Sequence, residues 1–253
     1  MDIVIIGSGN VAAILGRKFR ASGHLIVQVA ARNAAAASAL AYEWNTMSTS
    51  YMSAINRNAE VYIIAVTDIA ISDVVRELKL PGKIVAHTAA SVPKEVLKHV
   101  TEHYGVFYPL QSLNKDMKNL PDMPVFIDGS DDHTKRKLEM LAHSIAKVKV
   151  AEAGNDERLK LHVAAVFVSN FVNHLYLLAE EYCNKEGLDF KQLLPLIEET
   201  ASRIKDISPK EVQTGPALRR DIETIQKHLD LLKDHHQLKN IYILLTESIQ
   251  QMK

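Results

Sequence analysis

The chain is poor in cysteine and has no excess of charge of either sign. Cys183 is the single cysteine among 253 residues, and 30 basic residues match 30 acidic ones. A single cysteine excludes a disulfide within the chain and favours a reducing compartment, so we expect a cytoplasmic protein. The balanced charge gives no reason to expect nucleic acid or an anionic membrane as a partner.

Long apolar runs and metal-ligand spacings are also lacking. We expect no membrane span, because no apolar run reaches the required length, and no signal peptide, because Met1 leads directly into a predicted strand. The 11 histidines are scattered, and His235 and His236 lie in a polar turn without ligand spacing, so we expect no metal. Apolar residues make up 47% of the chain, which suffices for a sizeable core.

The first motif is a strand, a glycine turn and a helix at the N-terminus. Residues 2–6 form a β-branched run that stops at Gly7 and Gly9, and a helical pattern follows. Gly7 permits the sharp turn, Gly9 lets the backbone approach a phosphate, and Ala12 is the small residue where helix meets strand. The N–H groups at the helix start would face a pyrophosphate. This order favours a dinucleotide site; the alternative is a Rossmann-like fold that has lost its ligand.

The rest of the chain divides by its periodicity into two domains. Further strands are predicted at 25–30, 46–49, 61–66, 83–87, 106–108, 125–127 and 147–150, with helices between several of them. After Asn155 strand signals vanish, and helices are predicted at 156–185, 189–206, 218–233 and 237–251. The predicted fold is α/β: a Rossmann-type, doubly wound, mostly parallel sheet at 1–152, followed by an all-α domain at 153–253.

The end of the second strand indicates which dinucleotide binds. Enzymes that prefer NAD carry an acidic residue near this point, whereas Arg32 can pair with a 2′-phosphate. We therefore favour NADP(H) over NAD; the alternative is a solvated cation at the strand end. Thr67 and Asp68 follow another strand and either contact the cofactor or cap a helix. The predicted cofactor contacts are Gly7, Ser8, Gly9, Asn10, Val11, Arg32, Val66, Thr67, Asp68, His87, Thr88 and Ala89.

A polar stripe follows the helix at 160–175. His162, Ser169, Asn170 and Asn173 fall in one sector about 100° wide, with Val166 among them. The helix is otherwise apolar all round near its middle, which predicts that it is buried. Its polar side chains then either form a satisfied core network or face a cleft. Because a cofactor domain precedes this helix, we favour a cleft between the two domains.

Catalytic and substrate roles are predicted around this stripe. Reduction of a C=O or C=N bond needs a hydride and a proton, and histidine titrates near neutral pH, so His162 is the expected proton donor. Ser91 and Asn170 complete the predicted catalytic set. Arg219 would bind a carboxylate or phosphate of the substrate; the alternative is a local ion pair with Asp221. The predicted substrate contacts are Gln111, Ser112, Ser169, Asn173 and Arg219.

Several motifs together resemble one group of Rossmann-like proteins with a helical C-terminal domain of unknown function. These motifs are Gly7–Ala12, His87–Ser91, Tyr108–Ser112, Leu161–Phe171, and Thr214–Pro216 with Arg219 and Asp221. The group is similar in layout to pyrroline-5-carboxylate reductase, the deazaflavin-dependent NADP oxidoreductases and the β-hydroxyacid dehydrogenases. The resemblance implies an NADP-linked oxidoreductase and a dimer built on the helical domain. β-Hydroxyacid dehydrogenases carry a lysine one turn before an asparagine, where this chain has Val166.

The sequence therefore predicts an NADP-dependent reductase or dehydrogenase that acts on a small polar substrate between its domains. The alternative is a non-catalytic dinucleotide-binding regulator or scaffold, which the missing lysine favours. The helical domain has more apolar residues than four or five helices are expected to hide, so a homodimer through this domain is predicted.

Overall fold

The computed structural model describes residues 1–117 and 119–252, and its contacts separate an α/β unit from a helical unit. The first unit is Met1–Asn170 and the second is Phe171–Lys253. This division falls inside a long helix, whereas the sequence places the domain boundary at residue 152, just before that helix begins. The boundary at 152 stays a prediction.

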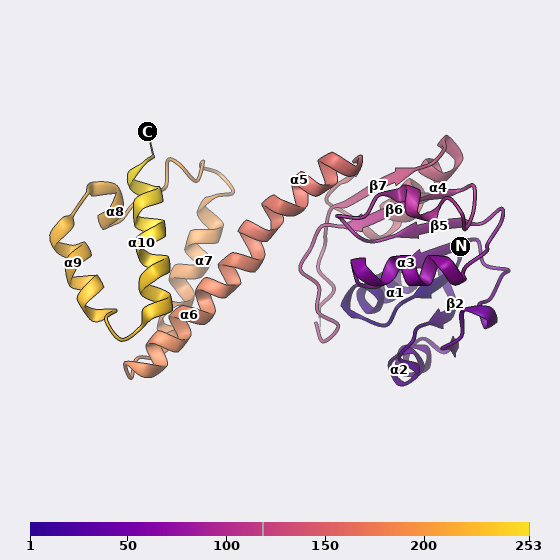
Figure 1. The fold of residues 1–253 in the computed structure, drawn as a ribbon, viewed down its shortest axis with the longest axis horizontal. Helices are drawn as coiled ribbons and strands as arrows, with labels where there is room; N and C mark the ends of the chain where they lie inside the picture. Colours follow the sequence, from indigo (N-terminus) through magenta and orange to yellow (C-terminus); the bar gives the residue numbers. More distant parts are fainter. Residues whose placement is uncertain (118, 253) are drawn as a thin grey trace. The chain divides into compact units, whose positions relative to one another are not determined.

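Eight strands of the described residues form one sheet in the α/β unit (Figure 1). They are β1 (Asp2–Ile6), β2 (Leu25–Ala30), β3 (Met47–Thr49), β4 (Val61–Ile64), β5 (Ile84–His87), β6 (Tyr104–Pro109), β7 (Val125–Gly129) and β8 (Val150–Glu152). Their order is β3-β2-β1-β4-β5-β6-β7-β8, and β6 and β7 form the antiparallel pair. The predicted mostly parallel sheet is confirmed, although its last strand lies at 150–152 rather than 147–150.

Helices cover both faces of this sheet. Successive side chains of its buried strands are apolar and point to opposite faces, so both faces need covering. Ile3 and Ile5 of β1 pack in one cluster with residues of α1 (Asn10–Ala21), α2 (Ala34–Trp44) and α4 (Asp132–Ile145). Val4 and Ile6 pack in another with residues of α3 (Asp68–Glu77) and the short helices η1 (Met52–Ala54) and η2 (Lys94–Leu97). The strand order reverses direction between β1 and β4, which is where ligands of such sheets bind.

A continuous helical stretch of 31 residues, Asn155–Lys185, follows the sheet. It consists of α5 (Asn155–Ala165), the π-helical turn η3 (Val166–Phe171) and α6 (Val172–Lys185). The prediction that this helix is buried is wrong for the single chain: 6% of its most apolar window is buried, and Val168 is 74% exposed. The sequence pattern shows that the helix is apolar, but it does not show whether other residues cover the helix.

The same stretch bears on the expectation of no membrane span, which stays a prediction. Among the described residues it is the one helix long and apolar enough to cross a membrane, with a mean hydropathy of 1.4 over its best window. His162, Ser169 and Asn170 break its apolar run but leave the average high. Length and composition alone support this reading, and core helices of other proteins satisfy the same criterion.

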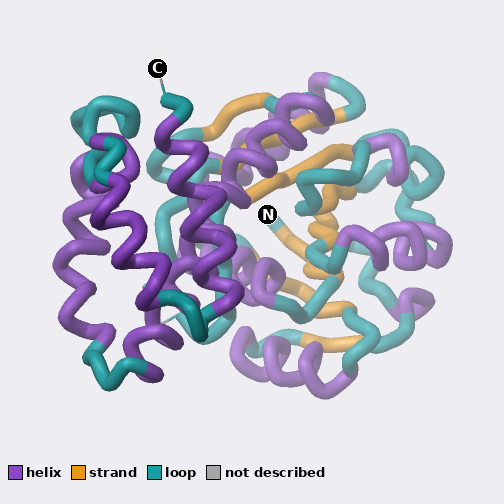
Figure 2. Tube along the Cα trace, turned by 60° about the vertical axis from the view of Figure 1, so that its left-hand side comes forward, coloured by secondary structure: helices purple, strands orange, loops and turns teal. Residues whose placement is uncertain are grey.

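The helical unit continues with short helices joined by turns (Figure 2). They are η4 (Phe190–Leu193), α7 (Leu194–Arg203), α8 (Pro216–Arg219), α9 (Ile222–Leu231) and α10 (His236–Gln250). Gly215 precedes Pro216 at the start of α8, and Asp221 caps α9 by accepting a hydrogen bond from the Thr224 N–H at 3.1 Å. The described residues of this unit bury few apolar side chains: Leu178, Cys183, Ala217 and Leu232.

Candidate functional site

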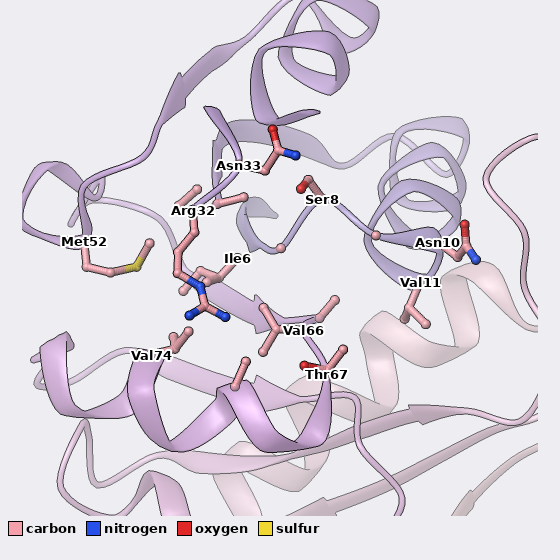
Figure 3. Close-up of a pocket in the computed structure, with 16 residues that line it drawn as sticks. Ile6, Ser8, Asn10, Val11, Arg32, Asn33, Met52, Val66, Thr67 and Val74 are labelled. Carbon is pink, nitrogen blue, oxygen red and sulfur yellow. The ribbon is translucent and has the colours of Figure 1, made fainter. Parts of the chain in front are cut away.

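A pocket of about 470 Å³ opens where β1, β2 and β4 end (Figure 3). Cavities of about 300–1,000 Å³ are the usual size of small-molecule sites. It is lined by Ile6, Gly7, Ser8, Gly9, Asn10, Val11, Ala30, Ala31, Arg32, Asn33, Met52, Ala65, Val66, Thr67, Ala70 and Val74. Eight of the twelve predicted cofactor contacts are therefore brought together, and Asp68, His87, Thr88 and Ala89 are not in the lining.

Gly7 sits in a turn that no other residue fits. Its φ is 130°, its N–H donates to the Ala30 carbonyl at 2.8 Å, and an added Cβ would lie 2.1 Å from the Ala65 oxygen. A Cβ on Gly9 would meet nothing within 4 Å, so the open side of the loop faces free space. The N-terminal N–H groups of α1 lie directly after this loop, which is the arrangement that accommodates a pyrophosphate.

Arg32 extends into the pocket from the loop after β2. Figure 3 shows its guanidinium between Met52 and Val66, above Val74. Its Nη1 lies 4.0 Å from the Asp73 Oδ2, and its side chain is 74% exposed. An exposed pair at this distance is worth little, so a bound phosphate can replace it at small cost. The role of Arg32 at a 2′-phosphate stays a prediction.

Thr67 and Asp68 separate into two roles at the start of α3. Thr67 occupies the N-cap position, but its side chain makes no capping hydrogen bond and lines the pocket instead. Asp68 points to the turn after β5, where its carboxylate accepts a hydrogen bond from the Ser91 hydroxyl. The predicted catalytic residue Ser91 is therefore held beside the pocket edge by a residue predicted to bind cofactor.

His87 ends β5 as a fully buried, neutral side chain. Burial and then the charge of Arg158 lower its pKa to about 4. Its Nδ1 accepts the Ala89 N–H at 3.2 Å, which places the ring proton on Nε2. Among the described residues, Nε2 has no hydrogen-bond partner. The contacts of His87 shape the turn that carries Thr88 and Ala89.

Arg158 of α5 fixes this turn to the helix, a role that sequence analysis did not predict. It is 1% exposed and donates to the carbonyls of Ala90 (3.2 Å), Ala153 (3.3 Å) and Val92 (2.9 Å). Its fourth acceptor is the Asn155 Oδ1 at 2.8 Å. Burial lowers its pKa, and no carboxylate among the described residues forms an ion pair with it. In the sequence it reads as one more charged residue in a polar first turn.

His162 is joined to Tyr108 at the end of β6. The Tyr108 hydroxyl lies 3.1 Å from the His162 Nδ1, and their rings meet edge to face at 6.3 Å. Tyr108 is 8% exposed and packs with Ala90 and Ala153, whereas His162 is exposed. Burial raises the pKa of Tyr108, Arg158 opposes the rise and Asp68 adds to it. Sequence analysis places Tyr108 in a predicted strand and in one of the resembling motifs but predicts no role for its side chain.

None of the hydrogen bonds among the described residues joins the remaining predicted residues to the Tyr108–His162 pair. Ser169 and Asn170 lie in the π-helical turn η3, whose wider i→i+5 geometry bends the straight stripe expected for an α-helix. Asn173 is exposed on α6. The Gln111 Oε1 accepts the Ser112 N–H at 3.0 Å in an exposed loop.

Arg219 belongs to the helical unit and is exposed on α8. Asp221, its expected alternative partner, is bound to Thr224, whose N–H and hydroxyl are the main causes of its lowered pKa; Arg219 contributes a smaller Coulombic effect. The described residues contain no Arg219–Asp221 ion pair. They also contain no group of three or more metal-ligating side chains.

A glycine turn between β1 and α1, an arginine after β2 and a pocket at the reversal of strand order define a Rossmann-type dinucleotide-binding protein. Comparison with known families agrees. Residues 2–91 match the family described as NADP oxidoreductase, coenzyme F420-dependent, and residues 123–249 match the domain of unknown function DUF2520. The chain belongs to the Rossmann-like NADP oxidoreductases that carry this C-terminal domain.

Solved structures support the assignment. A candidate NADP oxidoreductase from Bacteroides fragilis is 36% identical, with a TM-score of 0.92 over 99% of this chain and 98% of that one. A protein from Thermotoga maritima is 20% identical, with a TM-score of 0.75 over 97% and 99%. An Aspergillus terreus reductive aminase in complex with NADPH shares the fold at 15% identity, with a TM-score of 0.67 over 99% and 95%. No curated protein matches the chain. The predicted family and the NADP(H) cofactor are confirmed.

Proposed function

We propose that this protein transfers a hydride between NADP(H) and a small polar substrate that contains a C=O or C=N bond. The observation that carries the proposal is the Tyr108–His162 pair, a linked acid–base couple in the same unit as the dinucleotide pocket. A protein that only sensed the cofactor would need no such couple. The missing lysine at Val166 is the observation that favours the alternative, a non-catalytic dinucleotide-binding regulator or scaffold.

The residues at the pocket suit the cofactor. Gly7 and Gly9 leave room for a pyrophosphate, the start of α1 supplies N–H donors, and Arg32 supplies a cation for a 2′-phosphate. NADPH, when bound, supplies a hydride to the substrate carbon. The Tyr108–His162 pair is proposed as the source of the accompanying proton. The proposed roles of Ser91 and Asn170 in catalysis, and of Gln111, Ser112, Ser169, Asn173 and Arg219 in substrate binding, stay predictions, as does a cleft between the domains.

Two measurements test this function. Thermal unfolding is followed with NADP, NADPH, NAD and an F420-type deazaflavin in turn, because a ligand of the folded state raises its stability by mass action. We expect NADP and NADPH to stabilise the protein more than NAD. NADPH oxidation is then followed with cyclohexanone, the carbonyl compound present in one structural neighbour, and with a cyclic iminium salt. Binding without turnover of either compound would favour the regulator.

We also propose that the protein is a homodimer through the helical unit. Leu196, Leu231 and Leu244 of this unit are more than half exposed, at 63%, 63% and 65%. Exposing several large apolar side chains to water is unfavourable, because burying each one contributes about 1.5–3 kcal/mol of stabilising free energy. Light scattering at micromolar concentration tests the proposal. Leu244→Lys should shift the mass towards the monomer, whereas Leu25→Lys, at the 60% exposed Leu25 of the α/β unit, should not.

A further inference from the structure

Tyr108 and His162 join a buried hydroxyl to an exposed imidazole. The Tyr108 side chain is packed against Ala90 and Ala153 and is 8% exposed. His162 lies on the exposed side of the pair, on α5. Because Nδ1 of His162 contacts the Tyr108 hydroxyl at 3.1 Å, Nε2 is the nitrogen that remains for water. The pair therefore connects a dry position to solvent through two hydrogen-bonding atoms.

The sheet register places the dry end of this pair at the edge that carries the pocket. Val106 pairs with His87 across β6 and β5, so Tyr108, two residues further on, stands beside the turn that contains Ala89 and Ala90. Ala90 shares a packed cluster with Tyr108. At the same edge, Thr67 lines the pocket and the neighbouring Asp68 binds Ser91. The hydrogen bond to Tyr108 joins His162 to this edge.

We infer that the Tyr108 hydroxyl, and not His162 itself, protonates the reduced substrate atom, while His162 returns a proton to Tyr108 from solvent. This inference rests on the proposed function and names a catalytic residue for it. With a carbonyl substrate, hydride from NADPH forms the new C–H bond and the C=O π electrons become a lone pair on oxygen. The Tyr108 O–H bond breaks as the substrate O–H bond forms. The His162 Nδ1–H bond then breaks as Tyr108 regains its proton, and Nε2 takes a proton from water.

The surroundings of Tyr108 suit a hydroxyl that stays protonated until the substrate oxygen becomes basic. Three ionisable groups face it: His162 and Arg158 from α5, and Asp68 from the start of α3. Burial raises its pKa, with Arg158 opposing and Asp68 reinforcing the rise. The neutral form is then the form present near neutral pH.

Two substrates that differ in their need for a proton test the role of Tyr108. Cyclohexanone must gain a proton on oxygen, whereas N-methyl dihydroisoquinolinium already carries a fixed positive charge and becomes a neutral amine on accepting a hydride. Tyr108→Phe keeps the ring and its packing but removes the hydroxyl. We expect this variant to reduce cyclohexanone about a hundredfold more slowly than the wild type, which is within the range of general acid catalysis. Its rate with the iminium ion should be unchanged.

Tyr104→Phe is the matched control, because it removes a tyrosine hydroxyl from the start of the same strand. It should reduce both probes at the wild-type rate. Equal slowing of both probes in Tyr108→Phe, or no slowing of either, would overturn the role of Tyr108 while leaving the proposed function standing. A wild type that binds NADPH but reduces neither probe would overturn the proposed function itself, and the role of Tyr108 with it.

A second readout needs no turnover. Nitrogen NMR of the chain labelled in its histidines follows Nδ1 of His162 without cofactor. Tyr108→Phe should shift this resonance, because the hydrogen-bond partner at 3.1 Å is lost, whereas Tyr104→Phe should not. Identical His162 resonances in the wild type and Tyr108→Phe would show that the pair does not exist in solution and would overturn the relay.

Discussion

Removing the buried imidazole of His87 should change how stability depends on pH. Its pKa is about 4 in the folded protein and 6.5 in the unfolded reference, because burial and the charge of Arg158 disfavour the imidazolium ion. Between these two values the unfolded chain binds more protons than the folded one, so stability falls as pH falls through this window. The stability that depends on neutral His87 is fully present above the pKa of the unfolded chain, and it is lost as pH falls towards the pKa of the folded protein.

The magnitude follows from the two pKa values. A difference of one unit corresponds to about 1.4 kcal/mol, so a drop from 6.5 to about 4 gives roughly 3 kcal/mol over the whole window. Between about pH 7 and about pH 4.5, the loss assigned to His87 is about 2 kcal/mol. Asp68 and Glu95 raise the pKa of His87, but their effects are smaller than those of burial and Arg158.

Urea unfolding of the wild type and His87→Asn at several pH values measures this difference. The single tryptophan, Trp44, is buried in α2 of the same unit, so its fluorescence reports on this unit rather than on the helical one. His87→Asn should be less stable near neutral pH, by about 1–3 kcal/mol, because packing is lost. Its stability should then fall less with acid than that of the wild type, by about 2 kcal/mol. His99→Asn, at an exposed position, is the control. Parallel pH curves for the wild type and His87→Asn would refute the reasoning.

Four further predictions concern the pocket and its support. Arg32→Ala should weaken NADP binding by about 1.5–3 kcal/mol with little effect on NAD; calorimetry decides, and equal losses would remove Arg32 from the 2′-phosphate site. Gly7→Ala should destabilise the Trp44-monitored unit by about 3 kcal/mol, because its φ is 130° and its Cβ would meet the Ala65 oxygen. Gly9→Ala, whose Cβ meets nothing within 4 Å, should keep stability but lose cofactor affinity; the opposite pattern would contradict the assigned roles. Arg158→Lys should cost about 2 kcal/mol, because one ammonium cannot reach the four acceptors of the guanidinium; a stability equal to that of the exposed-site control Arg136→Lys would contradict this.

The glycine-turn half of the candidate site was predictable from local rules. Strand, glycine turn and helix occupy consecutive residues, and Gly7 is required by a backbone angle that the sequence motif itself anticipates. Arg32 lies two residues after the end of β2, so its place at the pocket depends on the ends of two neighbouring strands. Met52, Ala70 and Val74 line the same pocket but carry no polar signal, and apolar residues of this kind are indistinguishable from core residues in a sequence.

The long helix was misread because amphipathicity does not say what covers a helix. An apolar circumference predicts burial only if the chain supplies the covering residues, and here Val163 is 53% exposed and Val168 is 74% exposed. The π-helical turn at Val166–Phe171 also has no simple sequence signature. A helical wheel drawn at about 100° per residue therefore misplaces Asn173 relative to His162, because the π-helical turn lies between them.

The pairing of Tyr108 with His162 marks the limit of sequence reasoning about the chemistry. Alternation along β6 puts Val106 and Tyr108 on one face, and parallel strands put Tyr108 at the same edge as His87. The approach of His162 depends on how α5 leaves β8, and that direction is set by the buried Arg158, which binds Ala90 and Val92 on one side and Asn155 on the other. Because Arg158 holds both the β5 turn and α5, its loss should move His162 relative to Tyr108 even though it touches neither hydrogen-bonding atom. The chemistry of the pair therefore depends on a residue whose importance only the folded chain reveals.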